Sequence, residues 1–295
     1  FHNAESLAIY EESSLRWFEK RLLADANVRV EEHPVGAFGK LPFLALTSAR
    51  RATSNSSLVY MFDAVLREFG APDSFFVGRS DASGAWKLDI DAAVFAIRKS
   101  MFANRPLVLL GTAFNFVHLL DHFVAKNIRC QLARGSRVLE TGGYKGQSRE
   151  VPRSELHALI TKHVGIQPEY IVTEYGMSEL SSQAYDRVAG EVQGPRSKVQ
   201  VRSTAETHSP FPLFPSASFH VPPWARVQII SPETGREVAE GETGLIRIFD
   251  LANVRSVMAI QTEDLGVWRG SGFELIGRAS QAEARGCSLM SAASL

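Results

Sequence analysis

Apolar residues recur at helical spacing near the start of the chain and then give way to short apolar runs. The helical spacing predicts helices over residues 4–25 and 56–69. Farther along, the apolar runs alternate with stretches of helical period. The runs are residues 74–78, 106–111, 137–141 and 170–173, and the helical stretches are residues 89–102, 114–125 and 152–164. This alternation predicts an α/β fold in which helices pack on layers of parallel sheet.

The pattern changes after Asp186. Residues 203–223 are rich in Pro, Ser and Phe and have little period, which indicates a long ordered loop or a linker between lobes. Three later runs predict strands, at residues 225–230, 244–249 and 255–260. We therefore expect an α/β core over residues 1–202 and a β-rich lobe with a short C-terminal tail over residues 203–295.

Composition narrows the class of protein. The 295 residues are 45% hydrophobic and 22% charged, as in ordinary soluble domains. The 32 Lys and Arg balance 32 Asp and Glu, which gives no electrostatic basis for binding nucleic acid or an anionic membrane. The apolar runs are too short for a membrane helix. Two cysteines, Cys130 and Cys287, make no disulfide framework, so a cytoplasmic location is expected. The chain opens at Phe1 in a stretch of helical character, and we infer that an N-terminal portion lies upstream.

A glycine pair follows the predicted strand at residues 137–141. Gly142 and Gly143 at this place would let a phosphate or a flat ligand approach the backbone closely. Paired glycines after strands are common, however, and by themselves they more often only turn the chain.

The segment Thr173–Glu179 ends another predicted strand. Ligands of open α/β sheets bind outside the carboxyl ends of the strands. Tyr175 can stack on a purine, Ser178 can donate a hydrogen bond to a phosphate oxygen, and Glu179 can hold Mg²⁺ beside phosphates. The mixture of glycine with these polar groups favours a ligand site over a buried tyrosine beside a solvated glutamate.

Two later segments are weaker signals. Asp264, in Thr262–Gly266, is expected on a tight turn, where it either accepts both hydroxyls of a ribose or is an ordinary turn acid. Arg278 follows Gly277 and can reach a ribose or a phosphate. Neither segment indicates a site when taken alone.

The order of these four segments resembles that of the adenylate-forming superfamily. The similarity is greater to the acyl-protein synthetases, the fatty-acid-activating ligases of bacterial bioluminescence, and to their relatives near phenylacetate-CoA ligase. The residues that carry the resemblance are 56–61, 111–116, 140–146, 173–183 and 285–289, which extend over almost the whole chain. The resemblance implies the fold of an adenylate-forming N-terminal domain, with parallel sheet layers packed by helices and a small β-rich lobe.

The resemblance also implies a role for each matching residue. Gly142 and Gly143 would flank the adenine of ATP, Asp264 would bind the ribose with help from Arg278, and Ser178 would contact the α-phosphate. The implied nucleotide-binding set is Gly142, Gly143, Tyr144, Tyr175, Gly176, Asp264 and Arg278. Glu179 would bind Mg²⁺, so ATP and Mg²⁺ are the expected cofactors.

For the acid substrate, the resemblance points to Phe114, Phe116 and His118 as the lining of an acyl pocket. A histidine packed on its own helix is an equally good interpretation of His118. Cys287 matches the cysteine that carries the acyl group as a thioester in the bioluminescence enzymes, and a thiolate is a suitable nucleophile for an acyl adenylate. The alternative for Cys287 is a small buried residue.

The expected function is ATP-dependent activation of a fatty or related carboxylic acid as acyl-AMP, followed by transfer to a protein cysteine. Cys287, Glu179 and Ser178 are the expected catalytic residues, and an acyl reductase and an acyl transferase are expected partner proteins. The chain contains no Ser/Thr/Gly-rich phosphate loop, which we expect upstream of Phe1. An acyl- or aryl-CoA ligase and a non-catalytic acyl- or nucleotide-binding subunit remain the alternatives.

Overall fold

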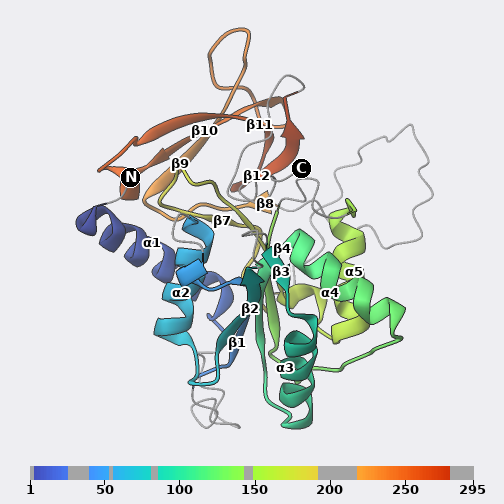
Figure 1. The fold of residues 1–295 in the computed structure, drawn as a ribbon. Coiled ribbons are helices and arrows are strands. Elements are labelled where there is room, and N and C mark those ends of the chain that lie inside the picture. Colours follow the sequence, from blue (N-terminus) through green and yellow to red (C-terminus); the bar gives the residue numbers. More distant parts are fainter. Residues whose placement is uncertain are drawn as a thin grey trace, which may run out of the picture.

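The computed structural model describes residues 3–25, 40–52, 56–80, 86–142, 149–191 and 218–279. These residues form two β-sheets, of seven and of five strands, and the helices pack around the larger one. Figure 1 shows the seven-stranded sheet between its helices and the five-stranded sheet beyond one end of it. Among the described residues, no helix is both long and apolar enough to cross a membrane.

The seven-stranded sheet has the order β3-β2-β1-β4-β5-β6-β7. Its strands are β1 (Phe43–Ser48), β2 (Phe75–Ser80), β3 (Trp86–Leu88), β4 (Val108–Thr112), β5 (Arg137–Thr141), β6 (Ile171–Tyr175) and β7 (Ala184–Tyr185). The five central strands, β2, β1, β4, β5 and β6, pair in parallel. β3 and β7 lie at the two edges and pair antiparallel to their neighbours. This arrangement confirms the predicted α/β class.

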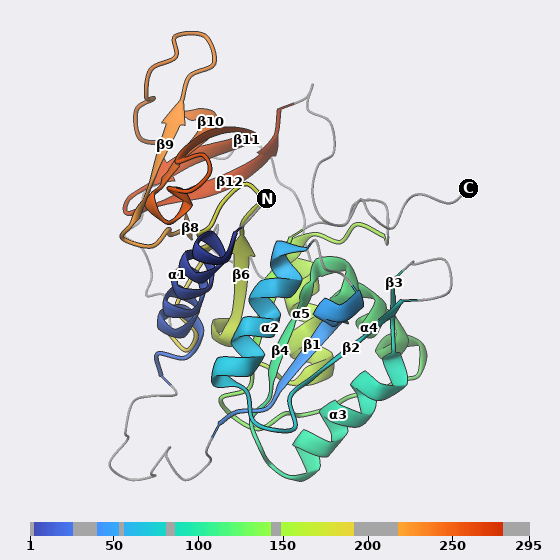
Figure 2. The same cartoon turned by 60° about the vertical axis from the view of Figure 1, so that its left-hand side comes forward.

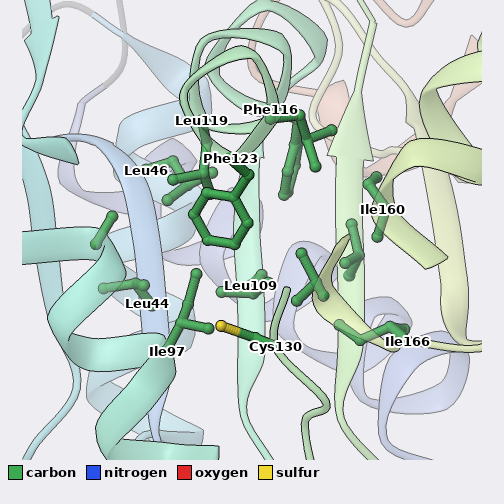
Figure 3. Packing of buried hydrophobic residues seen from close by; sticks show 14 of the residues in the cluster. Leu44, Leu46, Ile97, Leu109, Phe116, Leu119, Phe123, Cys130, Ile160 and Ile166 are labelled. Atoms are coloured by element: carbon green, nitrogen blue, oxygen red, sulfur yellow. The ribbon is translucent and has the colours of Figure 1, made fainter. Parts of the chain in front are cut away.

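Helices cover both faces of this sheet. The first face carries α1 (Ala4–Leu22) and α2 (Ser57–Phe69), and the second carries α3 (Ile90–Phe102), α4 (Ala113–Ala125) and α5 (Arg153–Val164), as Figure 2 shows. Alternate strand residues supply the two cores, because successive side chains of a strand point to opposite faces. Phe43 and Ala45 pack toward α1 and α2, whereas Leu44 and Leu46 pack toward α3 and α4. Figure 3 shows part of the second core.

Side-chain caps fix where several helices begin. Ser56, Asp89 and Thr112 each accept a hydrogen bond from a backbone N–H in the first turn of α2, α3 and α4. Thr112 is also the last residue of β4, so the chain passes directly from strand to helix at the carboxyl end of the sheet. Gly165 follows the last residue of α5, and its positive φ of 79° is the left-handed conformation common after helices.

The five-stranded sheet is antiparallel, in the order β8-β12-β11-β10-β9. Its strands are β8 (Ser218–Phe219), β9 (Ala225–Ile230), β10 (Thr243–Asp250), β11 (Ala259–Arg269) and β12 (Gly272–Arg278). A third apolar cluster joins it to the larger sheet, since Tyr175 at the end of β6 and the nearby Leu180 pack with Phe219 and Phe273. The smaller sheet therefore lies over the carboxyl end of β6.

The structure differs from the sequence predictions in several places. Of the strand expected at residues 255–260, only Ala259 and Ile260 lie in a strand, β11. Residues 43–48, for which the pattern predicted no strand, form β1 between β2 and β4. Asp264 lies inside β11 and not on a tight turn, because residues 259–269 pair with β10 and β12 on either side. Within the expected linker at 203–223, Ser218–Phe219 forms β8. The proposed domain boundary at residues 202 and 203 lies outside the described residues and stays a prediction.

Candidate active site

The carboxyl ends of three neighbouring parallel strands lie side by side at one end of the larger sheet. Thr112 of β4 is in register with Thr141 of β5, and Thr141 is in register with Glu174 of β6. Gly142 follows directly and is exposed, and among the described residues nothing lies within 4 Å of the place where a Cβ would be. A ligand can thus approach the backbone at Gly142. Its predicted neighbours Gly143 and Tyr144 lie outside the described residues.

Tyr175, Asp264 and Arg278 come from the two different sheets and form one hydrogen-bonded cluster. The Tyr175 hydroxyl donates to Asp264 Oδ2 at 2.9 Å, and Arg278 Nε donates to Asp264 Oδ1 at 3.2 Å. Asp264 and Arg278 are cross-strand partners of β11 and β12, which explains their approach. The structure therefore brings together three of the residues assigned to the nucleotide.

Aromatic rings surround Tyr175. Its ring centroid lies 5.9 Å from that of Phe219 and 5.7 Å from that of Phe273, and 8% of the residue is exposed. Burial, followed by the nearby Asp264 carboxylate, raises the pKa of Tyr175 well above 10, so its hydroxyl keeps its proton and donates to Asp264. Stacking of adenine on this ring stays a prediction.

The segment after β6 exposes the polar groups assigned to the phosphates. Gly176, Ser178 and Glu179 are exposed, and the Ser178 hydroxyl donates to Glu179 Oε2 at 3.2 Å. Among the described residues, no group of three or more His, Cys, Asp or Glu side chains is placed to hold a metal ion. A single accessible carboxylate still fits Mg²⁺, which commonly binds one or two carboxylates together with substrate phosphates and water.

Glu174 lies just before Tyr175 and faces inward. Burial, with a smaller effect from Glu140, raises its pKa to about 7, although a hydrogen bond with Thr141 favours the charged form. A Cβ at Gly176 would lie 2.1 Å from Glu174 Oε1, so a side chain there would displace the buried carboxyl group. This close approach accounts for glycine at position 176.

The residues assigned to the acid substrate are less closely grouped. Phe114 and the exposed His118 lie one turn apart on α4, with ring centroids 6.3 Å apart in an edge-to-face arrangement. Phe116, by contrast, is 1% exposed and packs in the second core, where Figure 3 labels it beside Leu119. Its side chain therefore contributes to the core rather than to an open surface. Cys287 lies outside the described residues.

Comparison with known proteins places the chain in a family. Residues 21–210 match the family described as acyl-protein synthetase, LuxE. The chain belongs to this family. It is similar to the long-chain-fatty-acid–luciferin-component ligases of Aliivibrio fischeri, at 24% identity over 218 residues, and Vibrio harveyi, at 21% over 215 residues. Both matches cover 69% of this chain, which spans about half the length of each relative, 50% and 49%.

Solved structures show the same fold at low identity. An open conformation of 2-hydroxyisobutyryl-CoA ligase in complex with 2-HIB-AMP and CoA is 11% identical, with a TM-score of 0.55 over 97% of this chain and 56% of that one. The ATP-bound RpMatB-BxBclM chimera B1 is 15% identical, with a TM-score of 0.52 over 92% and 43%. The amide bond synthetase McbA from Marinactinospora thermotolerans is 13% identical, with a TM-score of 0.51 over 92% and 45%. The LuxE-family chain thus has the fold of adenylate-forming enzymes.

Three residues at this end of the sheet escaped the sequence analysis. Glu174 adjoins a predicted site residue, and its position at a strand end was the available signal. Asp250 and Asn253 hold the segment that carries Ser178 and Glu179, through contacts with residues about 70 positions earlier in the chain. No local pattern reveals such contacts, since Asp250 ends β10 and Asn253 lies three residues later, far in sequence from the residues that they contact.

Proposed function

We propose that this LuxE-family chain is the adenylating part of an acyl-protein synthetase. It joins a fatty or related carboxylic acid to AMP from ATP, and the acyl group then passes to a protein cysteine. The family match, the adenylate-forming fold and the names of the two luciferin-component ligases support this proposal. An acyl reductase and an acyl transferase are the proposed partner proteins.

Each site residue would bind a different part of the nucleotide. Gly142 and Tyr175 would hold the adenine, since one offers open backbone and the other an aromatic ring. Asp264 would accept hydrogen bonds from the ribose hydroxyls, with Arg278 holding its carboxylate in place. Ser178 would donate to the α-phosphate. Glu179 would hold Mg²⁺, which would neutralise charge on the phosphates when bound.

Two steps follow from this arrangement. A carboxylate oxygen of the acid attacks the α-phosphorus of ATP, which forms acyl-AMP and releases pyrophosphate. A thiolate then attacks the acyl carbon, forms the thioester and displaces AMP. The first step depends mainly on positioning and on stabilisation of charge, which the exposed Ser178 and the paired Asp264 and Arg278 can supply. We propose Cys287 as the thiolate of the second step.

The observation that carries the proposal is the contact of Tyr175 with Asp264 across the two sheets. Acid-dependent exchange of pyrophosphate into ATP by the full-length protein tests it. Asp264→Asn is expected to lower the exchange rate about 100-fold. Glu274→Gln is the matched control, because Glu274 lies in the same sheet and pairs with Arg269 at 3.1 Å much as Asp264 pairs with Arg278. Equal rates for both variants would refute the assignment of Asp264.

The acyl acceptor needs a separate experiment. After incubation with ATP and radioactive fatty acid, the Cys287→Ser variant is expected to release pyrophosphate and to carry no covalent label. Label that survives the substitution removes Cys287 from the scheme. Product release that depends on coenzyme A would instead indicate an acyl- or aryl-CoA ligase, and ATP binding without exchange for any acid would indicate a non-catalytic binding subunit.

A further inference from the structure

The segment that carries Ser178 and Glu179 is exposed at its tip and anchored at its base. It leaves β6 after Tyr175 and returns antiparallel as β7, which begins at Ala184. Ser181, Ser182 and the residues up to β7 are buried. Within the segment itself, the described hydrogen bonds between backbone groups include the turn contact from Leu180 N–H to the Met177 carbonyl at 3.1 Å. Leu180 packs in the third apolar cluster, and polar side chains from outside the segment add further contacts that hold its conformation.

Two polar residues of the smaller sheet supply this support. The Asp250 carboxyl group, at the end of β10, is fully buried and accepts hydrogen bonds from Ser181 N–H at 2.9 Å and from the Ser182 hydroxyl at 2.8 Å. It also caps the short 3₁₀ helix η4 (Leu251–Asn253) by accepting from Ala252 N–H at 3.0 Å. One carboxyl group thus joins the base of the segment to the end of β10.

Asn253 reaches the exposed tip itself. Its Nδ2 donates to the carbonyl oxygen of Glu179 at 2.7 Å and to that of Val257 at 2.8 Å, and its Oδ1 accepts from the Ser181 hydroxyl at 2.9 Å. The residue is 4% exposed, so these bonds form away from competing water. All three hydrogen-bonding contacts orient the amide, and one of them ends on the backbone of Glu179.

The anchor extends to the first helix. The Ser182 hydroxyl lies 3.0 Å from the hydroxyl of Ser13 in α1, and Trp224 Nε1 donates to both oxygens at 2.9 and 3.0 Å. Buried networks with every member paired hold one arrangement, since breaking any bond leaves a buried polar group unpaired. Three elements distant in the chain therefore fix the base of a segment whose tip is open to solvent.

We propose that Asn253, supported by Asp250 and Ser181, is a positioning residue for the phosphate-binding and Mg²⁺-binding groups of this site. Asn253 touches neither reactant and acts by fixing the Glu179 backbone, from which the Glu179 and Ser178 side chains project. The inference rests on the proposed function, because a positioning role for Asn253 requires that the Ser178 and Glu179 side chains bind MgATP.

The experiment compares three variants of the full-length protein. Asn253→Asp keeps the shape and an acceptor for Ser181 but loses the donor to the carbonyls of Glu179 and Val257. Ser181→Ala removes the hydroxyl that fixes the amide. Ser136→Ala is the matched control, since the Ser136 hydroxyl is equally buried and hydrogen-bonded to Leu107 N–H and the Ala133 carbonyl, but lies at the opposite end of the sheet.

Two measurements separate positioning from general loss of stability. The first is amide hydrogen exchange of the nucleotide-free protein, in which Leu180 and Ser181 are expected to exchange about tenfold faster in Asn253→Asp and Ser181→Ala than in Ser136→Ala. The second is ATP affinity by calorimetry with and without Mg²⁺. The gain in affinity from Mg²⁺ is expected to fall about tenfold in Asn253→Asp, less in Ser181→Ala, and not in Ser136→Ala.

The outcomes are distinct. An unchanged Mg²⁺ gain in Asn253→Asp, with wild-type protein that binds MgATP and exchanges pyrophosphate, overturns the positioning role and leaves the proposed function in place. A Mg²⁺ gain that falls equally in Ser136→Ala also overturns it, since the effect would then follow stability. A wild-type protein that binds no ATP refutes the proposed function, and the positioning role falls with it.

Discussion

The two ends of the seven-stranded sheet differ in how far their polar side chains are exposed to solvent. At the amino end, Ser136 donates and accepts hydrogen bonds, and Arg137 pairs with Asp25 at 2.6 Å and with the Leu22 carbonyl. Ser136 and Arg137 are both buried. At the carboxyl end, Ser178 and Glu179 in the segment after β6 are exposed. The amino end thus serves stability, whereas the carboxyl end keeps polar groups available to a ligand.

The largest expected effect concerns activity at the carboxyl end. Glu179→Gln removes an exposed charge, so the free energy of unfolding is expected to change little. Loss of the proposed Mg²⁺ carboxylate is expected to slow pyrophosphate exchange by about 10²- to 10³-fold. Glu233→Gln, also exposed but in the turn after β9, is the control for the loss of one negative charge. Wild-type exchange in Glu179→Gln would show that this carboxylate has no part in the reaction.

The second effect tests the buried acid at the same end. The folded protein keeps a proton on Glu174 up to a pKa of about 7, whereas the unfolded chain loses it near 4.5. The folded state therefore binds more protons between these values, and stability falls as pH rises from about 4.5 to about 7. Glu174→Gln is expected to remove this fall and to be more stable by roughly 3 kcal/mol above pH 7, since one pKa unit is about 1.4 kcal/mol.

Chemical denaturation at a series of pH values measures this difference, with wild type and variant in the same buffers. A variant profile parallel to that of wild type between pH 4.5 and 7 would mean that Glu174 ionises normally in the folded protein.

At the amino end the expected effect is on stability. Arg137→Ala removes a buried guanidinium and leaves Asp25, whose side chain is 34% exposed, without this partner. Because water can reach Asp25, the expected loss is about 2 kcal/mol, below that for a fully buried pair. Exchange activity per folded molecule is expected to stay at the wild-type value. An Arg137→Ala variant of normal stability and lowered activity would contradict the assignment of stability to the amino end and of activity to the carboxyl end.

The smallest effect concerns one hydroxyl group. Tyr175→Phe keeps the ring between Phe219 and Phe273 but removes the donor to Asp264. The expected result is a KM for ATP raised about fivefold, from the loss of about 1 kcal/mol, with kcat little changed. Steady-state kinetics at saturating acid measure both constants, and Tyr170→Phe is the control. An unchanged KM would mean that the hydroxyl does not orient Asp264 for the ribose.

Elements of the fold were predicted correctly from the sequence where the local pattern and the tertiary structure agree. The strand expected at residues 137–141 is β5, because its apolar run has flanking turns and a helix after it. β1 was missed although it is buried on both faces like β4, because its apolar run covers only residues 43–46 before the polar Thr47 and Ser48. Asp264 was placed on a turn because of the nearby Gly266, but pairing with two neighbouring strands overrides that local preference.

Only the site residues that lie close together in the sequence could be predicted to lie together in the structure. Tyr175, Ser178 and Glu179 follow one strand in sequence, so their common position could be inferred. The approach of Asp264 to Tyr175 rested on resemblance alone, because 89 positions separate the two residues. The support from Asp250 and Asn253 could not be inferred at all, since hydrogen bonds across the two sheets appear only once both are folded.

The most direct test of the account is a crystal structure of the full-length protein with AMP and a fatty acid. The account predicts the adenine between Gly142 and Tyr175, the ribose hydroxyls on Asp264 and the phosphate beside Ser178. AMP bound away from these four residues, with Asp264 still engaged only by Tyr175 and Arg278, would contradict it.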